Sequence, residues 1–378
     1  MKTALSFGTC LAAASAAAAL FAGPAAATAT PNRVDGPAVF VQTDDPAGNR
    51  VVAYARDRDG SLHPSATYST GGIGGVLDGS VVDHTASQGA VQYDAAHHLL
   101  YVTNAGSDSI TVFRVRGQYL ERRQVISTRG SFPASITVHG NDVFVLNARD
   151  GGSIQGYLRA GDFLVAVPRW HRGLHLDPSG APEFTHTPGQ VAFTPDGSAL
   201  LVTTKAASSS VDAFRLSGSG ELAAKPVVTS LPGAVPFAMT FDRSGHLLLA
   251  EAGTNSLATF AVRGDGSLLP LAAAATGQAA TCWIVRVGSN VYLSNAGSAN
   301  LSGYHVSPDA TVATALGTTA TDAGTIDAAA SSNGKYLYVQ TGAAGIVDAF
   351  AVGAHGALSA IGSITVPDAA GAEGIAAT

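Results

Sequence analysis

Short runs of alternating apolar and polar residues, separated by Gly, Asn, Asp and Ser, dominate this chain. Residues 89–130 show the pattern most clearly, where GAVQYD, LLYVTN, ITVFRVR and LERRQVIST are separated by polar turns. Alternation over four to eight residues between such turns is typical of β-strands joined by hairpins. Four strands within these residues predict one blade of a β-propeller.

The second strand of this pattern recurs along the chain. Its copies are FVQT at Phe40, YVTN at Tyr101, FVLN at Phe144, LVTT at Leu201, LLAE at Leu248, YLSN at Tyr292 and YVQT at Tyr338. The intervals run from 43 residues (Tyr101 to Phe144) to 61 residues (Phe40 to Tyr101), and a repeat of about 45 residues is the propeller period. The sequence therefore predicts an all-β, seven-bladed propeller over residues 38–378, with four-stranded antiparallel blades. The two longest intervals predict insertions at Tyr68–Gln88 and Pro168–Pro188.

The first strands predict how the ring closes. They begin near Ala90, Ala134, Gly189, Phe237, Cys282 and Ile326, and the first blade has no such strand before Phe40. The segment GAEGIAAT, residues 371–378, resembles a first strand but has no second strand after it. We expect it to be the innermost strand of blade 1, which would remove the open junction between the first and last blades. The alternative is a frayed tail.

The N-terminal residues resemble a secretory signal. Lys2 precedes an almost wholly apolar run from Ala4 to Phe21, and small residues follow at Ala25–Ala27. This arrangement predicts a signal peptide at 1–27 and a lead-in linker at 28–37. It also predicts a secreted or extracytoplasmic protein, in the periplasm or at the cell surface, with no stable membrane insertion after cleavage. The alternative is an uncleaved membrane anchor. Only Cys282 would remain in the mature chain, so no intrachain disulfide is possible.

The amino-acid composition limits the classes of molecule that the protein is expected to bind. The chain is 46% apolar and 13% charged, which supports a large folded core. Its net charge is −6 and it has no long basic run, so nucleic acid is excluded as an expected partner. We expect a monomer that acts on or binds a small molecule or an envelope component, without a cofactor.

The expected propeller topology indicates on which face of the ring each histidine lies. In a propeller, the loops between second and third strands and the loops between blades share one face around the central channel. Small-molecule sites favour that face. Four of the eleven histidines lie in the two insertions that belong to it: His84, His171, His175 and His186.

The second insertion offers a possible metal site. His171 and His175 are four residues apart, with His186 nearby, and imidazole suits a transition metal. A four-residue spacing aligns ligands only on a helix, however, and Pro168, Gly173 and Pro178 disfavour one. We therefore expect no metal here and favour a polar lid over the channel. His84 is expected either to bind substrate or to be an ordinary loop residue.

Polar residues at the strand ends predict a ring of side chains at the channel mouth. Second strands end at or just before Asn104, Asn147, Lys205, Glu251 and Asn295, and first strands begin near Gln190, Asp327 and Glu373. The asparagines can equally be explained by turn geometry. A partly desolvated carboxylate such as Glu251 or Glu373 could act as a general base.

Several of these repeats carry a family resemblance. TPGQVAFTPDGSALLVTTKAASSSVDAFRL, AYARDRDGSLHP and AVRGDGSLLPLA are similar to repeats of the seven-bladed propeller lactonases, which include 6-phosphogluconolactonases and 3-carboxymuconate cyclases. YVTNAGSDSITVF is also similar to the Tyr-Val-Thr-Asn repeats of cell-surface proteins. The resemblance covers about Val39 to Thr378 and implies a lactone hydrolase or a cyclase.

The resemblance also implies a His, Arg and Glu site at the channel mouth. The family's blade 5 usually reads Pro-Arg-His and ends the next strand with Glu. Pro236 and Glu251 match, but Phe237 and Ala238 stand in place of Arg and His. In blade 4, Gly189 follows Pro188 where a His is common. Without the arginine, a phosphorylated sugar lactone is a doubtful substrate.

Two functions follow from the sequence. In the first, Glu251 or His186 activates water for attack on a lactone, of which a sugar lactone is one case. The oxyanion is stabilised by Asn104, Asn147, Gln190 or Lys205. The rest of the substrate site consists of Asn295, Glu373 and His84. In the second, the propeller is non-catalytic and binds carbohydrate, an envelope component or protein outside the cytoplasm.

Overall fold

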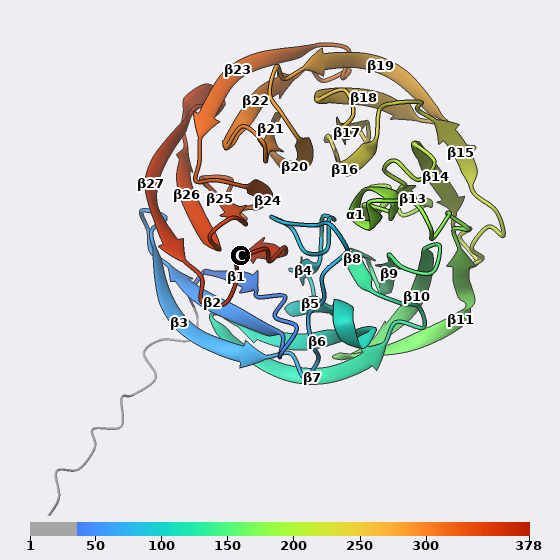
Figure 1. Ribbon diagram of the computed structural model, residues 1–378, viewed down its shortest axis with the longest axis horizontal. Coiled ribbons are helices and arrows are strands. Elements are labelled where there is room, and N and C mark those ends of the chain that lie inside the picture. The colour runs from blue at the N-terminus through green and yellow to red at the C-terminus, as the bar shows by residue number, and fades with distance from the viewer. Residues whose placement is uncertain (1–35) are drawn as a thin grey trace, which may run out of the picture. The chain divides into compact units, whose positions relative to one another are not determined.

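Seven four-stranded antiparallel sheets form a ring in the computed structural model, which describes residues 36–378 (Figure 1). The predicted seven-bladed propeller is confirmed. The signal peptide predicted at 1–27 and most of the predicted linker lie outside the described residues. No helix within 36–378 is long and apolar enough to cross a membrane.

Each blade runs from an inner to an outer strand. Blades 1 to 3 consist of β28 (Ile375–Ala377), β1 (Ala38–Gln42), β2 (Arg50–Arg56) and β3 (Leu62–Ser69); β4 (Val91–Asp94), β5 (Leu99–Asn104), β6 (Ser109–Arg116) and β7 (Tyr119–Ser127); β8 (Pro133–His139), β9 (Asp142–Asn147), β10 (Ser153–Ala160) and β11 (Phe163–Gly173). Blades 4 and 5 consist of β12 (Gln190–Phe193), β13 (Ala199–Thr203), β14 (Ser210–Arg215) and β15 (Val227–Ser230); β16 (Pro236–Phe241), β17 (Leu247–Glu251), β18 (Ser256–Val262) and β19 (Leu268–Ala275). Blades 6 and 7 consist of β20 (Thr281–Val287), β21 (Asn290–Asn295), β22 (Asn300–Val306) and β23 (Ala313–Ala320); β24 (Thr325–Ala330), β25 (Tyr336–Thr341), β26 (Ile346–Val352) and β27 (Leu358–Thr365).

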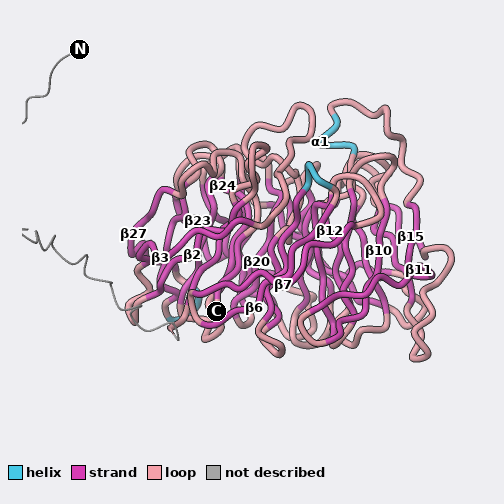
Figure 2. The backbone as a smooth tube through the Cα atoms, turned by 90° about the horizontal axis from the view of Figure 1, so that it is seen from below, coloured by secondary structure: helices cyan, strands magenta, loops and turns pink. Residues whose placement is uncertain are grey.

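Helices are few and short in the described part of the chain. They are α1 (Glu183–His186) and the 3₁₀ turns η1 (Ala105–Ser107) and η2 (Ala354–Gly356). Figure 2 shows α1 at one face of the ring, outside the strands. It therefore belongs to a loop region and not to the core.

The core lies between neighbouring blades. Second strands such as β5 and β25 are buried along their whole length, because both of their faces pack against the adjacent sheets. One cluster joins Phe40 and Ala53 of blade 1 to Leu100 and Phe113 of blade 2. A continuous apolar run such as LLYV suits a strand that is covered on both faces.

The ring closes as the sequence predicts. Strand β28 pairs with β1 in antiparallel register, Phe40 opposite Ala376. The amide of Gln42 donates to Gly374 O at 3.0 Å, and the amide of Thr378 donates to Ala38 O at 2.9 Å. These bonds satisfy an edge of β1 that would otherwise be open.

The boundaries of the second insertion need correction. Strand β11 continues to Gly173, so residues 168–173 belong to the outer strand of blade 3 and not to the predicted Pro168–Pro188 insertion. A register shift between Gln155 and Tyr157 lets the strand extend along β10 past Pro168. We call residues 70–90 the first insertion and residues 174–189 the second insertion.

Candidate active site at the channel mouth

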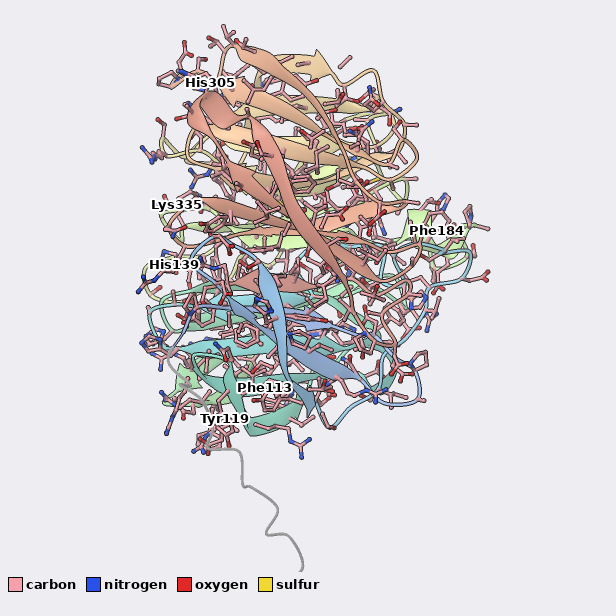
Figure 3. The ribbon with its side chains drawn as sticks, turned by 90° about the vertical axis from the view of Figure 1, so that its left-hand side faces the viewer. Phe113, Tyr119, His139, Phe184, His305 and Lys335 are labelled. Atoms are coloured by element: carbon pink, nitrogen blue, oxygen red, sulfur yellow. The ribbon has the colours of Figure 1, made fainter. Side chains whose placement is uncertain are left out.

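The two faces of the ring carry different histidines. In Figure 3, His139 and His305 lie on the face opposite Phe184, which belongs to the second insertion. His97 and His246 bond to Asp94 and Asp242 within their own turns, with Nδ1–Oδ2 distances of 2.7 Å. These histidines stabilise turns on the face away from the insertions.

The two insertions fill the channel mouth. In Figure 1 the first insertion runs across the centre of the ring and α1 lies inside the circle of blades. The insertions contact each other, since the amide of Asp78 donates to Glu183 Oε2 at 2.7 Å and the amide of Phe184 donates to Asp78 O at 3.3 Å. Arg149 forms an ion pair with Glu183 at 2.7 Å and anchors the second insertion to blade 3.

Lys205 fastens both insertions to blade 4. Its fully buried Nζ donates to Ala86 O and Phe184 O at 2.6 Å and to Thr187 Oγ1 at 2.9 Å. Trp283 of blade 6 adds a bond from Nε1 to Ser87 O at 2.7 Å. The mouth is therefore closed by specific polar contacts.

Beneath this cover lies a group of ionisable side chains that we call the channel cluster: Asp44, Asp83, Asp327, Glu373 and Lys205. They come from the end of β1, the first insertion, β24, the segment before β28, and the end of β13. All five side chains are buried. The ring thus brings together residues that are far apart in sequence.

Glu373 is the centre of the channel cluster. Its Oε1 accepts from the amide of Gly89 at 3.0 Å, and its Oε2 accepts from Thr85 Oγ1 at 3.2 Å and Ser87 Oγ at 3.4 Å. The charge of the nearby Asp327 carboxyl group is one of the causes that raise the pKa of Glu373. Two neighbouring carboxyl groups disfavour each other's ionisation.

Asp83 and Asp44 accept several backbone hydrogen bonds. Asp83 accepts from the amides of Thr85, Ala86 and Ser87 at 2.8 to 3.0 Å. Asp44 accepts from the amide of Glu373 at 3.1 Å and from the side-chain amide of Gln42. These donors favour the ionised forms and offset part of the cost of burial.

Burial displaces the pKa of every member toward neutrality. Desolvation raises the pKa of Asp44 to about 7, that of Asp83 to about 6 and that of Asp327 to about 7. Desolvation, with the charges of Asp327 and Asp83, raises the pKa of Glu373 well above its ordinary value. Desolvation also lowers the pKa of Lys205 to about 7, although Asp83 opposes the shift. Such displaced values are typical of acid–base sites.

The predicted catalytic pair does not meet. Glu251 is buried and accepts from Ser256 Oγ at 2.7 Å and Thr254 Oγ1 at 3.1 Å, both in its own hairpin. His186 lies in α1 and bonds through Nδ1 to Thr185 Oγ1 and Pro182 O, at 2.9 and 3.0 Å. No hydrogen bond in the described chain links Glu251, His186 or Glu373 to one another.

The predicted asparagines stabilise hairpins. Asn104 Nδ2 donates to Thr111 Oγ1 at 2.9 Å, Asn147 Nδ2 donates to Ser153 Oγ at 3.1 Å, and Asn295 Nδ2 donates to Ser302 Oγ at 2.9 Å. All three are fully buried. Their side-chain amide nitrogens are thereby engaged by the protein itself, as the turn explanation expects.

Gln190 and His84 have structural contacts. Gln190 Oε1 accepts from the amide of Met239 at 2.6 Å, which links blades 4 and 5. The ring of His84 packs against Gly371, where a Cβ would lie 2.1 Å from Nε2. Burial lowers the pKa of His84, so the ring is held neutral beside the C-terminal segment.

The histidines of the expected lid are dispersed. His171 is exposed on β11, and His175 is exposed in the second insertion. Among residues 36–378, no group of three His, Cys, Asp or Glu side chains is arranged to hold a metal ion. Within residues 36–378 Cys282 is a free thiol, and desolvation raises its pKa to about 12, so it is a poor nucleophile.

Asp44 and Asp83 were not among the predicted site residues. The repeats contain a signal for Asp44, because the residue directly after each second-strand motif is Ala or Gly in five blades. The two exceptions are Asp44 and Lys205. Asp83 has no such signal, since it lies in an insertion that has no counterpart in other blades.

Comparisons with known proteins agree with this architecture. The model of the lactonase family, described as a seven-bladed β-propeller, matches residues 38–161. No curated protein matches the chain. A putative 6-phosphogluconolactonase from Bacteroides fragilis superposes with a TM-score of 0.71 at 18% identity, covering 92% of this chain and 100% of that one.

A second solved structure is similar to the same extent. The periplasmic gluconolactonase of Pseudomonas aeruginosa superposes with a TM-score of 0.73 at 18% identity, covering 90% of this chain and 98% of that one. At these identities the structures establish the shared fold. The matched residues and the common ring of blades confirm the resemblance to the seven-bladed β-propeller lactonase family that the repeats predicted.

Proposed function

We propose that this protein hydrolyses a lactone at the channel cluster. The observation that carries the proposal is the burial of four carboxyl groups and one amine in one place, with pKa values displaced toward neutrality. An acid and a base that both operate near pH 7 are what ester hydrolysis requires. The match to the lactonase family supports the same reaction class.

The pKa values suggest how the roles divide. Asp83, with a pKa of about 6, is ionised at neutral pH and takes a proton from the attacking water. Glu373, whose pKa is raised well above its ordinary value, is the general acid in this proposal and donates a proton to the ring oxygen as the carbonyl carbon–oxygen bond breaks. Protonated Lys205 stabilises the negative charge on the carbonyl oxygen. The product is the hydroxy acid.

Substrate entry requires the insertions to separate. The bonds of Lys205 to Ala86 O, Phe184 O and Thr187 Oγ1 close the mouth, so the two loops act as a lid. Lid opening that limits turnover is common in enzymes with covered sites. In this proposal the lid excludes water other than the attacking molecule.

The test is a panel of sugar and aliphatic lactones assayed with the full chain. We expect Asp83→Asn and Glu373→Gln each to lower kcat by at least about 100-fold. Glu251→Gln, which removes a buried carboxylate outside the channel cluster, is the matched control and should retain most activity. Circular dichroism of each variant separates lost chemistry from lost folding.

Other outcomes would redirect the proposal. Activity that is lost in Glu251→Gln but kept in Asp83→Asn would move the base to Glu251. A wild-type protein inert on the whole panel would contradict lactone hydrolysis. His186→Gln tests the remaining candidate base in the same assay.

A non-catalytic propeller is the second candidate, and the closed mouth favours it. The cavity beside His186 has a volume of only about 20 Å³, far below an ordinary ligand pocket of about 300 Å³ or more. If the propeller is non-catalytic, we expect the folded chain to bind an envelope carbohydrate or an envelope protein specifically. Clear lactone turnover without any ligand on a glycan array would contradict it.

Export and a monomeric state belong to the proposal as well. N-terminal sequencing of the protein recovered outside the cytoplasm should begin near Thr28 if the predicted signal peptide is cleaved. Light scattering of that material should give the mass of one chain. Recovery of the whole product in the cytoplasm with Met1 intact would contradict export.

A further inference from the structure

A second cavity lies on the outer rim of the ring, between blades 3 and 4. Its volume is about 530 Å³, and we call it the basic cavity. Its lining includes four charged residues: Arg169, Arg172, Arg215 and Glu221. Arg169 and Arg172 belong to the part of β11 that the sequence placed in a loop. The proposed activity does not use this region.

Two irregular elements build the basic cavity. Strand β11 has 11 residues, whereas β15, the outer strand of blade 4, has only 4. The loop of residues 216–226 accepts hydrogen bonds from Trp170 and Arg172 in the extended part of β11. Trp170 Nε1 donates to Gly220 O at 2.7 Å, which fixes the loop on the strand.

Arg172 is held rigidly by the backbone. Its Nε donates to Ala223 O at 2.8 Å, and its other nitrogens donate to the carbonyls of Leu222, His171 and Arg169. These acceptors are neutral, so the positive charge of Arg172 is not cancelled. These bonds use four of its five N–H groups, so Arg172 contributes mainly a fixed positive charge beside the cavity.

Arg169 and Arg215 add two more positive charges. Both are exposed, and neither forms an ion pair in the described chain, nor does Glu221. Arg149 and Arg114, by contrast, are neutralised by Glu183 and Asp162. Three arginines therefore face one cavity with a single glutamate on its wall, in a chain whose net charge is −6.

We propose that the basic cavity binds a small organic oxyanion through phosphate or carboxylate groups. Planar guanidinium groups bind both oxyanions with paired hydrogen bonds. Ser217 supplies a hydroxyl group, and Leu216 and Leu222 supply an apolar wall for the carbon part of the ligand. The volume suits a molecule of monosaccharide to disaccharide size.

Isothermal titration of the full chain with pyrophosphate and with citrate tests the proposal. We expect one or both probes to bind, and the affinity to fall at least about tenfold for each arginine lost in Arg169→Gln and Arg215→Gln. Both residues are exposed, so the double variant should fold; its melting temperature checks this. The matched control is Arg243→Gln, an exposed arginine that lines two other cavities.

The two probes distinguish the oxyanion. Binding of pyrophosphate alone identifies a phosphate site, and binding of citrate alone identifies a carboxylate site. Failure of the wild-type chain to bind either probe would overturn the proposal. Unchanged affinity in the double variant, or loss of affinity in Arg243→Gln, would also overturn it, because binding would then lie elsewhere. Lactone turnover is not part of this test.

Discussion

At the scale of single residues, Lys205 has the largest structural role at the channel mouth. Its amine is fully buried and reaches three oxygen acceptors in two separate insertions. Desolvation lowers its pKa to about 7, so a substantial fraction is neutral at neutral pH. One side chain therefore holds the two insertions together and also contributes a charge beneath them that depends on pH.

Replacing this amine should loosen the lid. In Lys205→Met the carbonyls of Ala86 and Phe184 lose their donor, while a chain of similar volume stays in place. We expect amide hydrogen exchange to become at least about tenfold faster at Leu77 and Phe184, with blade cores unchanged. Lys335→Met, which removes an exposed amine, is the control. Equal exchange in both variants would show that Lys205 does not hold the lid.

Some site residues could be predicted from their position in the repeat, and their residue type mattered less. Lys205 and Glu373 were predicted because they lie at strand ends that face the channel, and both belong to the channel cluster. Asp83 was missed because the bonds that place it come from its own loop, which the repeat pattern does not describe. The sequence predicts His171 in the insertion, but β11 continues to Gly173 and carries His171 on the outer strand of blade 3.

At the scale of elements, β28 is the shortest strand in the ring and completes blade 1. It contributes three residue pairs to the sheet, and Ile375 packs with Val41 and Tyr338 in the core between blades 1 and 7. The alternating pattern predicted this strand, because GAEGIAAT repeats the first-strand pattern. Its pairing with β1 could be inferred only because blade 1 lacks a first strand of its own in the sequence.

Truncating the side chain of Ile375 should weaken the closure. We expect Ile375→Ala to lower the free energy of unfolding by about 2 to 4 kcal/mol, since the side chain is buried between two blades. Urea denaturation measures the change. Val81→Ala, at a side chain that is 80% exposed in the first insertion, should change it by less than about 0.5 kcal/mol. A cost below 1 kcal/mol for Ile375→Ala would argue that β28 adds little to the ring.

At the scale of the whole molecule, the channel cluster couples stability to pH. The pKa of Asp44 is about 7 in the folded chain and takes its ordinary value near 3.8 when unfolded. The native state therefore binds more protons than the unfolded state between about pH 4 and 7, and stability falls as pH rises through this window. Lys205 acts in the opposite sense between about pH 7 and 10.5, where the unfolded amine keeps its proton.

Comparison of variants isolates this effect from other titrating groups. Asp44→Asn should reduce the loss of unfolding free energy between pH 4.5 and 7 by at least about 1 kcal/mol, because one buried ionisation is removed. Asp59→Asn, at an exposed carboxyl group outside the cluster, serves as the control. Parallel pH profiles for Asp44→Asn and the wild type, measured by urea denaturation, would contradict a raised pKa for Asp44.

Closure by β28 also has a consequence for synthesis in the cell. This strand leaves the ribosome after all the other strands described here, although its partner β1 is the first of them. Blade 1 therefore stays incomplete until the six other blades have been made, and until then the backbone hydrogen-bonding groups along one edge of β1 have no strand partner. Glu373 arrives with the same segment, so the channel cluster is completed only when the ring is. A stalled or shortened chain would expose a strand edge prone to aggregation and would lack the centre of its proposed active site.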